Sequence, residues 1–268
     1  QVGKTEFGSG RFSTTVDLPN LDISKLTRYL PNAVMRGSAS LHADIDMIDG
    51  VPDIKAQVQA NRNFFSMASF ALGIDKALVE ASFTGSQIKT HTAVDLFRNR
   101  GRLEADINLS DPYEARKLSG NIELTELDLG LFQALGNAFN ELKGTASVHG
   151  SLGGDLSMPL FNGTVSAKGS AEPSVGIGKV ENFDFSLKAQ GSSGVIDGTL
   201  EANESTLRLT GNLDWRDGAR GDINVDSEDL YLFLAGYGDA HSIIHLKASL
   251  QDHMEVSGTV DIPYDPAE

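Results

Sequence analysis

The chain has no cysteine, which excludes a disulfide scaffold and a cysteine-ligated zinc site. Its longest apolar stretches, residues 64–74 and 230–236, are far shorter than the roughly 20 residues that a membrane helix needs. Lysine and arginine never form a run longer than two, and 37 acidic residues outnumber 22 basic ones. This balance excludes the basic footprint of a nucleic-acid-binding protein. Without an initial Met or a signal pattern, the sequence leads us to expect part of a longer protein.

Motifs of catalysis and metal binding are missing or incomplete. The sequence contains no G-x-S-x-G, Walker or complete G-x-G-x-x-G string. Residues 44–50 are similar to a calcium loop, but the third Asp and the Gly come one place late. His241 and His245 would share a face of a strand about 13 Å apart, too far for one metal ion. We therefore expect no enzyme, no metal site and no cofactor.

Apolar and polar residues alternate along most of the chain, which also contains 28 glycines. Period-2 alternation predicts strands with one apolar face, here about sixteen of them. Asp49-Gly50 predicts a hairpin turn, and so does Gly153–Asp155, whereas residues 64–74 fit either a strand pair or a helix. The other expected strands span residues 10–18, 37–47, 52–60, 79–83, 88–96, 101–109, 119–127, 144–152, 182–190, 195–202, 205–215, 221–225, 243–250 and 254–263, with one more after Pro159.

Two segments have helical spacing. Leu21–Pro31 predicts a short helix capped by Ser24, after Pro19-Asn20 ends the first strand. Asp128–Leu142 predicts a longer helix, with Asp128 as its cap and leucines on one side.

A repeat organises the chain. Residues 35–60 and 142–168 share the order of small and apolar residues, and Gly37 to Pro52 spans 15 residues, as does Gly144 to Pro159. We interpret the chain as two degenerate β repeats, residues 1–117 and 118–268, in one continuous elongated domain. His42 and His149 are equivalent in the two copies and are expected on the polar face.

The apolar faces mix small and large side chains. Two packed sheets of a sandwich would give this pattern, and so would one long sheet bent into a trough whose small residues leave room for a ligand. Trp215, Phe161, Phe183 and Phe185 could therefore be ligand contacts or core residues.

Three segments resemble the TamB family of the AsmA-like group, above all its C-terminal part: Leu142–Gly169, Ser205–Trp215 and Met254–Tyr264. The resemblance implies an all-β, elongated, curved open sheet, the β-taco, with a hydrophobic trough and one or two short helices. It implies a periplasmic protein anchored in the inner membrane through an N-terminal segment missing here. It also implies a TamA-like outer-membrane barrel partner and the carriage of phospholipid acyl chains between the two membranes.

The alternative function that this resemblance implies is a scaffold that assists the assembly of outer-membrane proteins such as autotransporters. For the lipid function, the expected groove lining consists of the apolar side chains of the second repeat. These are Ala146, Val148, Leu152, Phe161, Val165, Phe183, Phe185, Leu187, Ile196, Leu200, Leu207, Leu209, Leu213, Trp215, Ile223, Val225, Val256 and Val260.

Overall fold

The structure is a computed structural model that describes residues 6–8, 10–29, 32–67, 70–132, 139–174, 179–216, 218–234, 238–251 and 253–263. Strands dominate these residues. Within them, no helical segment is long and apolar enough to cross a bilayer. The strands are β1 (Glu6–Gly8), β2 (Arg11–Asp22), β3 (Ala33–Ile48), β4 (Val51–Met67), β5 (Phe70–Thr84), β6 (Gln87–Leu96), β7 (Arg102–Ser110), β8 (Lys117–Asp128), β9 (Phe139–Gly154), β10 (Pro159–Pro173), β11 (Val180–Gln190), β12 (Ser193–Ala202), β13 (Ser205–Asp214), β14 (Arg220–Leu234), β15 (Gly238–Leu250) and β16 (Met254–Asp261).

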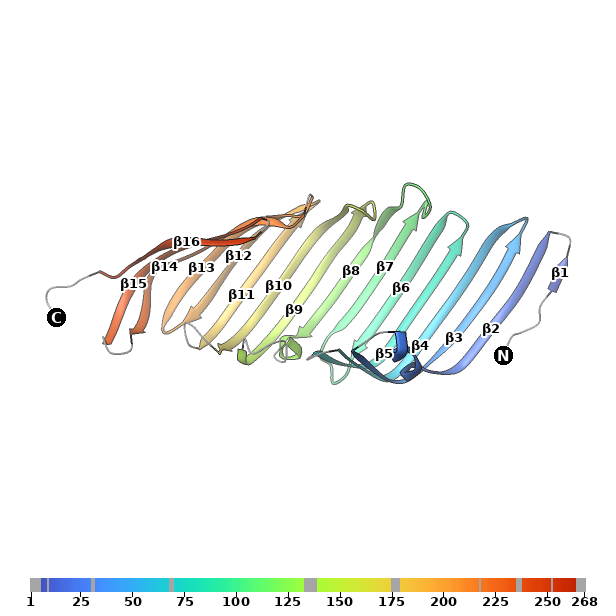
Figure 1. The fold of residues 1–268 in the computed structure, drawn as a ribbon, viewed down its shortest axis with the longest axis horizontal. Coiled ribbons are helices and arrows are strands. Elements are labelled where there is room, and N and C mark those ends of the chain that lie inside the picture. The colour runs from blue at the N-terminus through green and yellow to red at the C-terminus, as the bar shows by residue number, and fades with distance from the viewer. Residues whose placement is uncertain are drawn as a thin grey trace. The chain divides into compact units, whose positions relative to one another are not determined.

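The order of strands in the sheet is the order of strands in the chain, beginning at β1 and ending at β16. The chain divides into two compact units. Unit 1 comprises residues 1–127 and 149–160, and unit 2 comprises residues 128–148 and 161–268. In unit 1, strands β1 to β8 pair as successive antiparallel neighbours (Figure 1). In unit 2, strands β10 to β16 do the same. The predicted all-β fold with an open antiparallel sheet is confirmed.

The turn chemistry explains the register of the first hairpins. Asp49 and Gly50 both adopt positive φ, 50° and 79°, and Ile48 faces Val51 across the turn. This conformation matches the twist of the flanking strands, so the predicted hairpin is confirmed. Residues 64–74 also form a strand pair, in which Phe65 faces Leu72.

Two predicted breaks are wrong. Strand β2 does not end at Pro19-Asn20 but continues to Asp22, with a register shift between Leu18 and Leu21. Such an irregularity tolerates proline, which cannot donate to a regular ladder. The turn expected at Gly153–Asp155 comes later, because Gly153 and Gly154 belong to β9. There the Asp155 carboxylate accepts hydrogen bonds of 2.9 Å from the backbone amides of Ser157 and Met158.

The helix predictions are corrected in type, length and cap. The first segment is the 3₁₀ helix η1, Ile23–Tyr29, and its cap is Asp22 rather than Ser24, because Asp22 Oδ1 accepts the amide of Ser24 at 3.0 Å. The second segment forms only the 3₁₀ turn η2, Leu129–Phe132, and strand β9 has begun by Phe139. Residues 133–138 lie outside the described residues. Asp128 does act as a cap, for the amide of Gly130 at 2.8 Å.

The two proposed repeat copies share a local structure. In each, an aspartate-capped 3₁₀ turn precedes a strand of 16 residues, β3 or β9. The equivalent glycines Gly37 and Gly144 both adopt positive φ, 124° and 132°. These parallels agree with the repeat interpretation, whose boundary at residues 117/118 stays a prediction.

Gly144→Ala is expected to destabilise unit 2. A Cβ there would lie 2.1 Å from the carbonyl oxygen of Lys168 and 2.6 Å from Gly169 Cα, at a φ that side chains rarely adopt. Overpacking against backbone together with this φ costs about 2–4 kcal/mol. Gly153→Ala, in the same strand with no atom within 4 Å of the new Cβ, is the control. Thermal unfolding followed by circular dichroism measures both; equal melting temperatures would contradict the expectation.

Candidate functional site

The register of unit 2 aligns apolar residues of successive strands into rows that cross the sheet. One row passes through seven strands, β10 to β16, and six of its side chains are half-buried or are glycine. Because registered partners share a face, the whole row lies on one face of the sheet. We call it the middle row: Val165, Leu187, Ile196, Gly211, Ile223, Ala248 and Val256.

Other predicted lining residues lie in parallel rows on the same face of unit 2. Phe185, Leu209 and Val225 belong to the adjacent row, and Phe183, Leu200 and Leu207 to the row beyond it. The face is therefore continuous over β10 to β15 and apolar across several rows.

One end of this apolar face is covered and forms a core. Phe183 and Leu207 are only 7% and 6% exposed, and Leu230 is fully buried. Phe185 stacks on Phe183 with ring centroids 5.4 Å apart. The predicted lining residues Phe183 and Leu207 are thus core residues. The full cluster contains Ala171, Val180, Phe183, Ala202, Leu207, Leu230 and Ile244, with Leu129, Leu142, Ala167, Phe185, Leu200, Val225 and Leu246 packed against it.

The remaining predicted residues are less buried. Val256 and Val260 are 65% and 51% exposed. Leu152 belongs to unit 1. The half-buried ones in unit 2 are Ala146, Val148, Phe161, Val165, Leu187, Ile196, Leu213, Trp215 and Ile223.

Two glycines on this face make room for large neighbours. A Cβ at Gly198 would lie 2.3 Å from the ring of Phe185, and one at Gly194 would lie 2.7 Å from Leu187. At these positions the small residue accommodates a side chain of the adjacent strand. It does not leave the empty space that the trough interpretation suggested.

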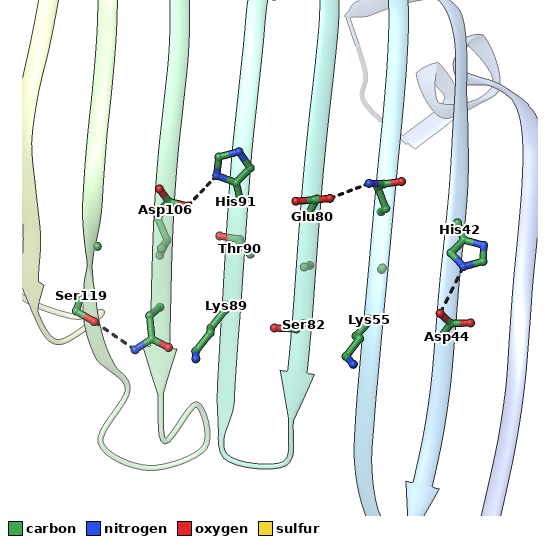
Figure 2. A pocket seen from close by; sticks show the side chains of 16 residues that line it. His42, Asp44, Lys55, Glu80, Ser82, Lys89, Thr90, His91, Asp106 and Ser119 are labelled. Atoms are coloured by element: carbon green, nitrogen blue, oxygen red, sulfur yellow. Dashed lines mark hydrogen bonds and ion pairs between the residues drawn. The ribbon is translucent and has the colours of Figure 1, made fainter.

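A groove of about 580 Å³ that was not predicted from the sequence lies on the polar face of unit 1. Its lining comes from β3 to β8, as two rows of polar side chains two residues apart along the strands (Figure 2). Between the rows lie Ala56, Ala81, Thr90, Ile107 and Gly120, which the ladder aligns across five strands. We call this feature the polar groove.

Hydrogen bonds engage the first row of the polar groove, which consists of His42, Gln57, Glu80, His91 and Asp106. His91 Nδ1 lies 2.7 Å from Asp106, and Gln57 donates to Glu80 at 2.7 Å. His42 Nδ1 lies 2.6 Å from Asp17 on β2, and its Nε2 lies 3.4 Å from Asp44. The hydrogen bond with Asp17 raises the pKa of His42, and the bond with Asp106 raises the pKa of His91.

Stability is expected to decrease over a window that begins near pH 6.5, the ordinary histidine pKa, and extends through the raised pKa values of His42 and His91. A histidine whose pKa is raised on folding contributes stability that is present below its unfolded pKa and is lost as the pH rises through the folded pKa. The lowered pKa values of Asp22, Asp155 and Asp222 act in the acid range, outside this window. The melting temperature should fall across the window, and a His42→Asn/His91→Asn double variant should lose most of that fall. A double variant whose melting temperature falls with pH as steeply as that of the wild type would contradict this expectation.

The residues considered as metal ligands from the sequence do not form a common site. Asp44 and Asp46 lie in β3, whereas Asp49 lies in the turn that follows. His241 and His245 each face a separate aspartate of β14, Asp229 and Asp226, at 2.5 and 2.9 Å. Among the described residues, no group of three His, Cys, Asp or Glu side chains is arranged to hold a metal ion.

These features define a class: an all-β protein whose strands follow chain order and which has an apolar face in unit 2 and a polar groove in unit 1. The family model for the N-terminal domain of TamB matches residues 7–167, more than half of the chain. The chain belongs to the TamB family. The resemblance to the C-terminal part of the family stays untested.

Among curated proteins, the chain is similar to the translocation and assembly module subunit TamB of Haemophilus influenzae. The two are 23% identical over 256 residues, which cover 91% of this chain and 19% of the relative. The chain thus spans about a fifth of the length of that relative. No solved structure matches it significantly.

Proposed function

We propose that the chain forms part of a translocation and assembly module and binds phospholipid acyl chains along the apolar face of unit 2, without catalysing a reaction. The observation that supports this most is the middle row, which offers apolar contact across seven strands. Seven strands at about 4.8 Å spacing would extend the row over about 29 Å.

The energetics favour an apolar path for lipid. Each methylene moved into water costs about 0.8 kcal/mol, so a chain of about sixteen carbons faces roughly 12 kcal/mol in transit. A half-exposed apolar row lowers that barrier because it replaces water along the acyl chain. The covered end is already packed, so we assign the path to the middle row and the half-buried Leu213 beside it rather than to Phe183 and Leu207.

The setting of this function is part of the proposal. The name of the Haemophilus influenzae relative places that protein in a translocation and assembly module. For this chain we propose a periplasmic location, a parent protein anchored in the inner membrane, and a TamA-like barrel partner in the outer membrane. The lipid would then move between the two membranes.

A photo-crosslinking amino acid at Leu187 is expected to capture phospholipid in living cells. The same amino acid at Lys188, the next residue and on the opposite face, is the control, because Lys188 is exposed and points away from the middle row. Mass spectrometry of the adducts identifies the lipid. Equal labelling at the two positions, or no labelling at Leu187, would contradict the proposal.

A further inference from the structure

The second row of the polar groove carries two lysines. It contains Asp44, Lys55, Ser82, Lys89, Asn108 and Ser119, which the ladder aligns on neighbouring strands β3 to β8. Every member except Asp44 can donate a hydrogen bond from its side chain. Figure 2 shows Lys55 and Lys89 on either side of Ser82.

The two lysines are exposed, and in the described part of the chain neither has a carboxylate within 4.0 Å. Two of the nearby acids are engaged elsewhere. Asp44 accepts from Thr15 at 2.9 Å and lies 3.4 Å from His42, while Asp106 is held by His91. The positive charge of the second row is therefore available to a ligand.

The groove has room for a small ligand beside the lysines. Beyond Lys89, Asn108 Nδ2 donates to Ser119 Oγ at 3.3 Å, so these two side chains are already bonded to each other. The groove volume of about 580 Å³ is within the range of small-molecule sites.

We infer that the polar groove binds a phosphate ester, with its phosphoryl group between Lys55 and Lys89 over Ser82. The two lysine backbones are two strand spacings apart, about 10 Å, and each ammonium sits on a flexible four-carbon stem that can close this distance. Ser82 lies between them as their registered partner and donates its hydroxyl.

The charge of the whole chain opposes anion binding. At a formal net charge of −15, the protein repels anions in general, so an anion that binds must depend on the local pair of lysines. The site lies on the polar face, opposite the side chains of Ala56 and Ala81, and it is independent of the lipid proposal for unit 2.

The test uses the 268-residue chain and two probes that share the phosphoryl group: soluble glycerol 3-phosphate, and vesicles containing phosphatidylglycerol. Titration calorimetry measures the first and vesicle co-sedimentation the second. The Lys55→Gln/Lys89→Gln double variant is expected to weaken binding at least about tenfold, because charge-assisted hydrogen bonds dominate anion recognition. The matched control, Lys168→Gln/Lys188→Gln, removes the same charge from exposed residues of unit 2.

The outcomes separate the two sources of phosphate. A loss of glycerol 3-phosphate binding in the groove variant alone supports a soluble ester, and a loss confined to vesicles supports a lipid headgroup. Absence of binding in the wild type, or equal weakening by the control variant, overturns the inference.

Discussion

Leu230→Ala is expected to lower the free energy of unfolding of unit 2 by about 2–5 kcal/mol, the usual cost of truncating a buried leucine when the site cannot collapse. Leu230 is fully buried, and Val180, Phe183, Ala202, Leu207 and Ile244 belong to the same core cluster. Its backbone carbonyl accepts the Ser242 hydroxyl at 3.0 Å. The substitution keeps that bond, so the effect reports the cavity alone.

Denaturant unfolding followed by tryptophan fluorescence measures this effect, because the signal comes from unit 2. Trp215 is the chain's single tryptophan and belongs to unit 2. Val195→Ala is the control, since Val195 is 62% exposed on the polar face and should change stability by no more than about 0.5 kcal/mol. A loss below about 1 kcal/mol for Leu230→Ala would mean that this cluster is not the core of unit 2.

Ile196→Asp is expected to abolish lipid capture by a crosslinker at Leu187. The two residues are registered neighbours in the middle row. An unpaired charge placed against an acyl chain costs several kcal/mol. A free-energy loss of about 1.4 kcal/mol lowers the affinity tenfold. We therefore expect a loss of lipid adduct of at least about a hundredfold, measured by mass spectrometry.

Val195→Asp is the matched control for this variant. It places the same charge one residue away, on the opposite and exposed face. Circular dichroism must show both variants folded with similar melting temperatures. Equal lipid capture in Ile196→Asp and Val195→Asp would contradict the lipid path along the middle row, whereas loss in both would point to an effect of charge on the chain as a whole.

The strands were predictable because their signal is local. Alternation assigns each residue to a face, and turn residues such as Asp49-Gly50 set the register without reference to distant contacts. The expected strands therefore agree with the observed ones in position, although their ends shift. β4, for example, runs on to Met67, well beyond the expected residue 60.

The helices were mispredicted because a 3₁₀ turn and an α-helix share a capping signal. Asp22 and Asp128 both accept a backbone amide two residues later, as a helix cap would, but the turns that they begin are short. Leu142, counted as a helical position, instead lies in β9 and packs against the core of unit 2. Spacing alone does not show that a leucine belongs to a strand.

The sites were predictable only in part. Alternation identified the apolar face but could not tell its covered end from the rest, because Phe183 and Leu187 have the same parity in one strand. The polar groove was missed for a related reason. Lys55, Ser82 and Lys89 are far apart in sequence and resemble ordinary solvent-facing residues until the ladder aligns them.

The order of strands in the sheet has a consequence for how the chain acquires its structure. Within each unit, successive strands of the ladder pair with their neighbours in the chain, so no strand must wait for a distant one. Closing short loops costs little entropy, and pairings of this kind form quickly. A chain that emerges from a translocation channel one end first could therefore fold hairpin by hairpin as it appears, and further hairpins could lengthen such a sheet without disturbing the register already formed.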